Sequence, residues 1–580
     1  MEVLKERPVK EVPAQSPSQD DIIQTHYEDA PARLNSQTLL ALMAVASQYN
    51  AYLFTLLMPS TVLSYINKDL GPDPSYTWIT VSWTLVAAVV VTVSGRLADI
   101  FGRRYFLIAG AVFGCIGALV GATAESINQM IASGVLFGLA GGFQEMCFGC
   151  IQELVPNKWR IMTVGIFELT ALVPFFSPLI AYAMLAHTAL GWRSIYWYIF
   201  AYEICGLALL VLFYKPPSFN TKHRVDQKTK LELLRQLDYV GVILFGAGCI
   251  CFLLGVSWGG HYPWKSVNVI LPIVLGVCLL IALGFWEKHA DLEYPILPPF
   301  LFRRLRSFTA VLVVCFVGGM LYYSMNVLWP QQSAAFFVPA DDIIIRGVYS
   351  NMVSFGTILG GVITVGICQH VGHERWQLVV FMIIQTALIG SLASVGMDDK
   401  VQAIATIIVL SSTVTPPQLL SFVMISLGLP DQADIGVANG LASTFRLLGG
   451  AVATAVYSAV RATEFTSVLD SKIRDIAAST SFPKEHIPAL INAAALGTDA
   501  AFEKVPGITT EVIDAATLAN KQSYVQAFKL VYLVAIAFGG VAIISCFFTK
   551  TIPKEVKTAH RAVHLENERT DVKTEEEQIN

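Results

Sequence analysis

Four ionisable side chains lie inside long apolar segments of this chain. Glu145, Glu168, Glu203 and Arg446 are each flanked by apolar and small residues. A charge inside an apolar layer is costly, so residues of this kind are candidates for a function by default. Glu145 and Glu168 fall at a comparable depth in their segments, where two carboxyls could share a proton. The alternative is that each group is only a structural hydrogen-bond partner.

The segments that carry these residues are typical of a membrane protein. Of 580 residues, 54% are hydrophobic and 14% are charged, and the mean hydropathy is +0.58. Fourteen runs are long enough to cross a bilayer, at 38–63, 78–98, 105–123, 128–152, 162–186, 195–214, 238–257, 267–286, 308–330, 347–367, 376–396, 401–426, 434–460 and 525–549. They are continuously apolar, which predicts helices and excludes a β-barrel. We therefore expect an all-α polytopic membrane protein with fourteen transmembrane helices.

The distribution of Lys and Arg predicts the orientation of these spans. Basic residues gather in the loops on one side, which is then the cytoplasmic side. Both polar tails, 1–35 and 550–580, are expected there and are expected to be disordered. The most basic cytoplasmic loop is 215–237, whereas 462–524 is predicted to be a long extracellular loop with helical patches. The net charge of −4 gives no sign of a nucleic-acid partner.

The sequence contains no arrangement that predicts enzymatic chemistry. All ten cysteines lie in apolar stretches, where a thiol packs as a small hydrophobic group, so we expect neither a disulfide nor a metal site. No G-x-x-x-x-G-K-[ST] motif is present, and no His/Asp or Cys/His set falls at one depth. We expect a protein that is not an enzyme, binds no cofactor and draws its energy from an ion gradient or from the gradient of its substrate.

The ten residues from Gly95 to Arg104 form the most specific motif. They read G-R-L-A-D-I-F-G-R-R and join the second and third predicted spans. The glycines allow close helix approach, and Asp99 can pair with Arg103 or face the positive N-terminal end of another helix. The motif resembles the G-x-L-a-D-x-x-G-R-[RK] loop of the major facilitator superfamily. The resemblance implies a cytoplasmic conformational latch, to which we assign Gly95, Asp99, Gly102, Arg103, Arg104 and Arg446.

The resemblance extends over nearly the whole chain. The stretches Trp192-Arg193, 237–241 and 440–450 are similar to the fourteen-helix drug:proton antiporter branch. The stretches 141–146, 155–160 and 505–507 most resemble the fungal trichothecene efflux pump group. Departures from the family pattern are Ile100 for a basic residue after Asp99, Gly134 for the Arg of span four, and Ser177 for the Gly before Pro178.

The resemblance implies a definite domain plan. Six-helix bundles are expected at 36–214 and 287–549, with two inserted helices at 238–286, and predicted spans one, four, nine and twelve surround a cavity. The polar and aromatic cavity candidates on these spans are Gln48, Tyr49, Asn50, Gln144, Tyr322, Tyr323, Asn326, Trp329 and Gln418. This mostly apolar set suits an amphipathic organic molecule better than a metal ion or a sugar. Because span four lines the cavity, we prefer Glu145 to Glu168 and Glu203 as the candidate for proton coupling.

The function expected from these features is secondary active transport. We expect proton-coupled efflux of a small amphipathic molecule, such as a mycotoxin or drug, by alternating access. One alternative is proton-coupled uptake of an iron–siderophore complex, and another is a transport-dead membrane sensor. The expected partners are the small-molecule substrate, protons and the lipid bilayer, with the protein a monomer. The plasma membrane is the expected location, with the vacuolar membrane as the alternative.

Overall fold

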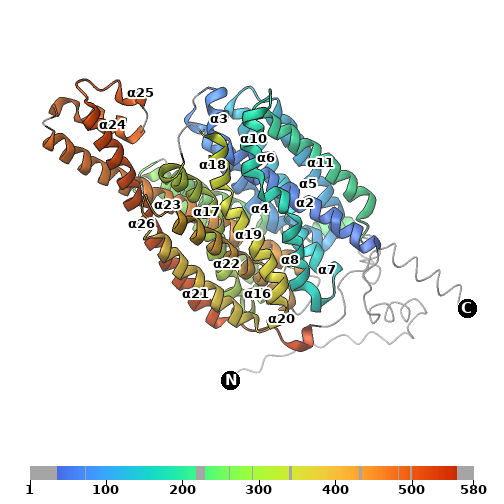
Figure 1. Cartoon of the computed structure of the whole chain (residues 1–580). Helices are drawn as coiled ribbons and strands as arrows, with labels where there is room; N and C mark the ends of the chain where they lie inside the picture. Colours follow the sequence, from blue (N-terminus) through green and yellow to red (C-terminus); the bar gives the residue numbers. More distant parts are fainter. Residues whose placement is uncertain are drawn as a thin grey trace, which may run out of the picture.

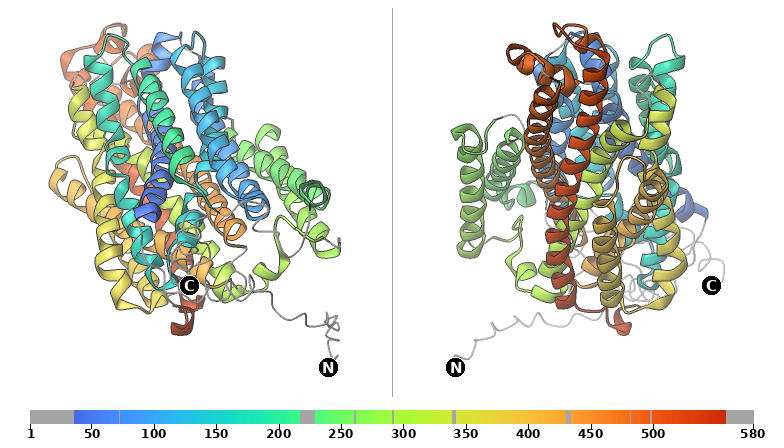
Figure 2. Two further views of the ribbon diagram at one scale, coloured as in Figure 1. Left: turned by 90° about the vertical axis from the view of Figure 1, so that its right-hand side faces the viewer. Right: turned by 60° about the vertical axis from the view of Figure 1, so that its left-hand side comes forward.

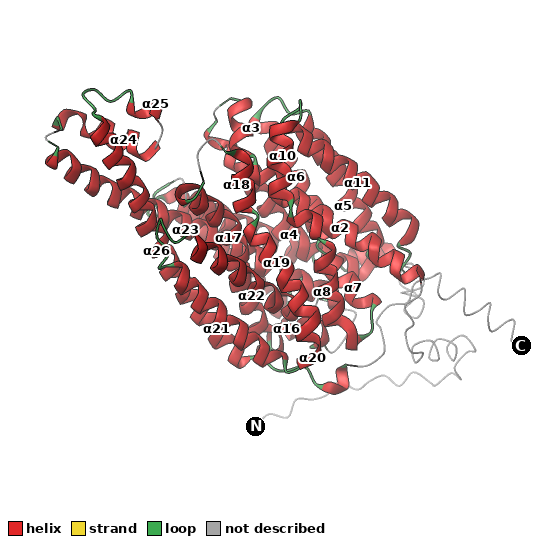
Figure 3. Ribbon diagram, in the orientation of Figure 1, coloured by secondary structure: helices red, strands yellow, loops and turns green. Residues whose placement is uncertain are grey.

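The computed structural model describes residues 36–557 except 72, 217–228, 260–261, 291, 339–341, 430–433, 481 and 497–498. Figure 3 shows helices joined by loops throughout this part of the chain, which confirms the all-α prediction. Pairing of extended backbone among the described residues is limited to one isolated parallel bridge between Leu237 and Tyr294. The predicted tail 1–35, most of the tail 550–580 and half of the basic loop 215–237 lie outside the described residues.

The N-terminal half begins with α2 and ends with α11. Its helices are α2 (Ser36–Thr61), α3 (Leu63–Asp69), η1 (Pro74–Thr77), α4 (Trp78–Phe101), α5 (Arg104–Ala122), α6 (Ile127–Gln144), α7 (Cys147–Leu154), η2 (Asn157–Trp159), α8 (Arg160–Thr170), α9 (Leu172–Phe175), α10 (Ser177–His187) and α11 (Arg193–Phe213). The fifth predicted span, 162–186, is divided into α8, α9 and α10. Pro174 and Pro178 lie in this divided stretch, where each removes a backbone donor from the helix.

The rest of the chain forms an inserted pair and the C-terminal half. The inserted region contains α13 (Lys230–Arg235), α14 (Tyr239–Trp258) and α15 (Val267–His289). The C-terminal half contains α16 (Pro299–Phe302), η3 (Leu305–Thr309), α17 (Ala310–Phe336), α18 (Ile343–Ser350), α19 (Met352–Ile363), η4 (Thr364–Cys368), α20 (Gln369–Val371), α21 (Glu374–Leu392), α22 (Lys400–Leu427), α23 (Ile435–Ser479), η6 (Lys484–His486), α24 (Ile487–Leu496), α25 (Asp499–Phe502), α26 (Thr510–Phe548) and η7 (Lys554–Val556).

Twelve helical stretches of the described residues are long and apolar enough to cross a membrane. Twelve of the fourteen predicted spans correspond to them, so a multi-pass membrane protein is confirmed, but the count of fourteen is not. The other two predicted spans lie in the divided α8–α10 stretch and in the first part of α23. That part of α23 carries Asn439 and Arg446 among many small residues, which lowers its mean hydropathy.

The two halves meet mainly where α4 packs along α23. Gly95 allows the helix axes to approach closely because it has no side chain. A Cβ atom at this position would lie only 2.5 Å from the carbonyl oxygen of Gly436. Farther along the same contact, the hydroxyls of Thr92 and Thr444 are 2.6 Å apart. We call the end of the bundles near Gly95 the motif end. On the other flank of the interface, α10 packs on α18, and α8 packs on α19 and α22.

The inserted helices α14 and α15 pack on each other and attach to the bundles through α14, which contacts α4 and α23. Figure 2 shows this green pair standing beside the rest of the molecule. Asp238 lies directly before α14. Its Oδ1 accepts hydrogen bonds from the Gly241 N–H at 2.7 Å and from Trp286 Nε1 at 2.9 Å. The first bond caps the N-terminus of α14, and the second ties it to the end of α15.

The predicted extracellular loop 462–524 is folded rather than open. The last turns of α23 and the first turns of α26 continue past the bundles and, with α24 and α25, form the projection that Figure 1 shows opposite α20. Apolar side chains from these helices make a separate core, with Leu469, Ile473 and Leu490 at its centre. The sequence predicts only helical patches here and not a folded subdomain, because α24 and α25 are short and Ala-rich.

We predict that the core of the subdomain stabilises it independently of the bundles. Leu490 is fully buried in α24 and Leu496, in the same helix, is 70% exposed. Leu490→Ala should lower the local free energy of unfolding by about 2–5 kcal/mol. Hydrogen exchange of the full-length protein in lipid nanodiscs should then show faster exchange in α24. Leu496→Ala is the matched control, and equal effects of the two substitutions would contradict a separate core.

Candidate functional site

A buried ion pair joins the two halves near the middle of the molecule. Glu145 lies at the break between α6 and α7, and Arg446 lies on α23. Their closest atoms, Glu145 Oε1 and Arg446 Nη2, are 3.6 Å apart, and the side chains are 0% and 6% exposed. Two charges buried this deeply stabilise each other, and removing either one leaves the other uncompensated. The structure thus places Arg446 with the candidate carboxyl of span four and not with the predicted latch.

Aromatic rings surround the guanidinium of Arg446. Its Cζ atom lies 5.7 Å from the ring centroid of Tyr322, 5.8 Å from that of Tyr323 and 5.9 Å from that of Phe422. Arg446 Nη2 is also 3.4 Å from the Tyr323 hydroxyl, which is 3.2 Å from the hydroxyl of Tyr52 on α2. Ring faces attract a cation while leaving the pocket apolar. The sequence predicts both tyrosines of α17 as cavity residues but not Tyr52 or Phe422, which lie on the expected cavity helices.

The second predicted carboxyl, Glu168, has a partner of its own. Its Oε2 accepts a hydrogen bond of 2.8 Å from the hydroxyl of Tyr49, which joins α8 to α2. The Tyr49 ring packs on Phe148 and Phe167. Glu145 and Glu168 thus have different nearest partners, Arg446 and the phenol of Tyr49, while the charge of Arg446 also acts on Glu168.

The third predicted carboxyl, Glu203, lies inside the N-terminal half. Its two oxygens accept hydrogen bonds of 2.9 and 3.0 Å from Nε2 of Gln144, which is also 3.4 Å from Oε1 of Gln48. Glu203 is fully buried, and a Cβ atom at Gly114 would collide with its carboxyl group. This cluster links α2, α5, α6 and α11, all within the N-terminal half.

The remaining predicted cavity residues bond to backbone carbonyls. Asn50 donates to Thr170 O at 3.2 Å, and Asn326 donates to Tyr322 O at 2.7 Å. Gln418 Nε2 donates to Gly318 O at 2.8 Å and thereby ties α22 to α17. Asn50 and Gln418 therefore connect helices and Asn326 bonds within α17, whereas the phenols and charges supply the interacting groups of the central site.

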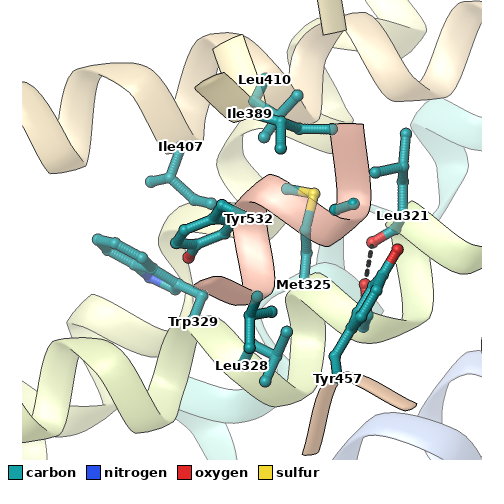
Figure 4. A pocket seen from close by; sticks show the side chains of 12 residues that line it. Leu321, Met325, Leu328, Trp329, Ile389, Ile407, Leu410, Tyr457 and Tyr532 are labelled. Carbon is teal, nitrogen blue, oxygen red and sulfur yellow. Dashed lines mark hydrogen bonds between the residues drawn. The ribbon is translucent and has the colours of Figure 1, made fainter. Parts of the chain in front are cut away.

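Trp329 lies away from the central site. Its Nε1 donates to Tyr349 O at 2.6 Å, and its ring lines a small apolar cavity. Figure 4 shows this cavity among helices of the C-terminal half, with Met325, Tyr457 and Tyr532 around it.

The predicted latch residue Asp99 caps a helix of the opposite half. Its carboxylate accepts hydrogen bonds from the N–H groups of Gly436 at 3.1 Å and Val437 at 2.8 Å, at the start of α23. Nη2 of Arg103 lies 3.2 Å from Asp99 and 2.5 Å from Glu153. The negative carboxylate and the positive end of α23 attract each other. Both arrangements foreseen for Asp99 therefore occur together.

A second charged contact closes the same end. Arg96 Nη1 lies 2.7 Å from Asp434 Oδ1, directly before α23, and Arg96 is 6% exposed. Sequence reasoning missed this pair, although Arg96 lies in the recognised motif, because its partner is far along the chain. Gly102 ends α4 with φ +92°, a backbone conformation that favours glycine. Arg104 instead bonds within the N-terminal half, to Val211 O at 2.9 Å.

Comparison with known proteins extends the assignment over the whole chain. The model of the fungal trichothecene efflux pump family (TRI12) matches residues 12–575. The trichothecene efflux pump TRI12 of Fusarium sporotrichioides is 30% identical over 525 residues, which cover 88% of this chain and 87% of the relative. The MFS-type transporter prx5 of Penicillium rubens is 26% identical, over 90% of this chain and 93% of the relative.

Solved structures share the fold. The human organic anion transporter MFSD10 superposes with a TM-score of 0.52 at 11% identity, over 87% of this chain and 100% of the other. The proton:xylose symporter XylE superposes with a TM-score of 0.50 at 13% identity, over 87% and 95%. These similarities show a major facilitator fold, and the family consists of transporters rather than enzymes. The chain is thus a multi-pass membrane transporter and belongs to the fungal trichothecene efflux pump family.

Proposed function

We propose that this transporter exports small amphipathic organic molecules, trichothecenes among them, in exchange for protons. The observation that carries the proposal is the buried pair of Glu145 and Arg446 at the interface of the two halves. The names of the relatives support efflux and the substrate class. We place the protein in the plasma membrane as a monomer in contact with lipid, with the motif end toward the cytoplasm.

The pair offers a direct way to couple a proton to the movement of the halves. When Glu145 binds a proton, its attraction to Arg446 is lost, and the buried cation is left with aromatic faces, the Tyr323 hydroxyl and the charge of Glu168. The two halves are then held together less strongly at this point. Loss of the proton restores the ion pair and the attraction between the halves. Protonation therefore biases the equilibrium between conformations, which is what alternating access requires.

The lining of the central site suits an amphipathic molecule. Rings of Tyr52, Tyr322, Tyr323 and Phe422 provide apolar faces, and three of them carry a hydroxyl. A carbonyl or ether oxygen of a substrate can accept a hydrogen bond from a phenol or from the Arg446 guanidinium. A hydroxyl of the substrate can donate a hydrogen bond to the charged carboxylate of Glu145, so that a proton and the substrate compete for this group, as exchange requires.

The motif end is closed in this structure. The Asp99 cap, the Arg96–Asp434 pair and a hydrogen bond of 2.5 Å from the Ser426 hydroxyl to Gln152 Oε1 all join the two halves there. We propose that these contacts break when the site opens to the cytoplasm and form again before export. The interface then works as a latch made of interactions that are individually modest and collectively reversible.

We predict that removing both charges of the pair abolishes coupling. The double variant Glu145→Gln/Arg446→Gln avoids the buried unpaired charge that either single substitution leaves. For one-for-one exchange, a gradient of about one pH unit sustains a substrate concentration ratio of about ten, and the double variant should bring this ratio to about one. The measurement is accumulation of a labelled trichothecene in sealed vesicles under an imposed pH gradient, with uncoupler added at the end.

The matched control for this experiment is Glu203→Gln. Glu203 is as fully buried as Glu145, but it bonds to Gln144 inside one half. The control should keep gradient-driven accumulation. The pair would be ruled out as the coupling site if the double variant concentrated the substrate as much as the unsubstituted protein does.

We predict a different defect for the latch. Asp99→Asn keeps the shape of the side chain but removes the charge that faces the start of α23 and Arg103. The variant should bind substrate with little change in affinity and export it more slowly, because the closed motif end forms less often. Binding to purified protein and the initial rate of export separate the two effects. Unchanged export together with weakened binding would contradict a gating role.

A further inference from the structure

The inserted helices reach the motif end through one short segment. Residues 292–298, which we call the strap, lie between α15 and α16. Tyr294 of the strap forms the parallel bridge with Leu237, the second residue before α14. The N–H of Leu297 donates a hydrogen bond of 2.7 Å to Oε1 of Glu287 near the end of α15. The strap is thereby fixed to the start of α14 and to the end of α15.

Apolar packing ties the strap to the N-terminal half as well. Ile296 is 1% exposed and belongs to a small cluster with Phe245 of α14 and Leu283 of α15. Val89 and Val93 of α4 pack against the same cluster. The strap therefore lies against the helix that carries the motif, and its position depends on the inserted pair.

The ring of Tyr294 lies over the guanidinium of Arg96. The Arg96 Cζ atom is 5.7 Å from the ring centroid, within the range of a cation–π interaction. Arg96 Nη1 makes the ion pair with Asp434 of the opposite half, and its buried Nε has no hydrogen-bond partner. The ring is thus a source of stabilisation for a nearly buried cation that bridges the two halves.

We propose that Tyr294 is a positioning residue of the motif end, which acts through Arg96 and gives the inserted helices a role in gating. The ring keeps the guanidinium in place for its bond to Asp434, so that less conformational freedom is lost when the motif end closes. The inserted pair then stabilises the closed state. This inference rests on the proposed opening and closing of the motif end during transport.

The test compares two substitutions of Tyr294, which distinguish the effect of the aromatic ring face from the effect of apolar side-chain volume. Tyr294→Leu keeps an apolar side chain without a ring face, and Tyr294→Phe keeps the ring. The readout is hydrogen exchange of the full-length protein in lipid nanodiscs, in the peptide that contains Gly436 and Val437, whose N–H groups bond to Asp99. Tyr294→Leu should speed this exchange by about threefold to tenfold, and Tyr294→Phe should leave it nearly unchanged.

Two controls make the result specific. Tyr262→Ala removes another aromatic residue of the inserted region, between α14 and α15, and should not change exchange at the motif end. Exchange in α17, whose side chains belong to the main core of the bundles, reports whether each variant is folded. No increase in Tyr294→Leu, or an equal increase in Tyr294→Phe, would overturn the proposal.

A second measurement asks whether Tyr294 acts through Arg96. In an Arg96→Gln background, Tyr294→Leu should add no further increase in exchange, because the cation is already absent. An increase as large as in the unsubstituted background would overturn this route. The exchange readout needs no transport, so failure of the proposed function would appear separately, as absence of proton-coupled export by the unsubstituted protein.

Discussion

A charged group inside a membrane must be paired or hydrogen-bonded, and this constraint organises the interior of the protein. Glu145 pairs with Arg446, Glu168 accepts from Tyr49, and Glu203 accepts from Gln144. The first of these is an ion pair between the two halves, and the charge of Arg446 also acts on Glu168. The other two hold helices of the N-terminal half together. The same requirement therefore produces both the contacts within the N-terminal half and the contact between halves that we propose a proton weakens.

The two regions that we propose for coupling and gating lie on one helix. Asp99 caps the start of α23 at Ile435, and Arg446 lies eleven residues further along, or about 16 Å at 1.5 Å per residue. A small rotation of α23 relative to α4 therefore changes the cap and the ion pair together. Gly95 and Gly436 allow the two helices to touch at this end. The missing cation of span four agrees with this arrangement, because a Cβ atom at Gly134 would collide with Ile79 O of α4 and Arg446 provides the charge from the other half.

Features that depend on the local sequence pattern were predicted well, and features that depend on partners far along the chain were predicted poorly. Helical class and membrane insertion follow from continuous apolar runs, and the environment of Asp99 follows from its motif. The role of Arg446 did not, because its position on the chain says nothing of which carboxyl faces it after folding. Asp434 was missed for the same reason. The segment 462–524 was expected to be a loop, because burial of its short helices depends on their packing against α23 and α26.

The most direct test of the account is the direction in which protons move when substrate moves. Purified protein in liposomes that contain a pH-sensitive dye would be exposed to an inward gradient of a trichothecene, with no pH gradient imposed. Exchange of substrate for protons predicts that the pH of the liposome lumen rises as the substrate enters and protons leave. An acidified lumen would indicate symport, and an unchanged lumen during substrate entry would show that transport is not coupled to protons.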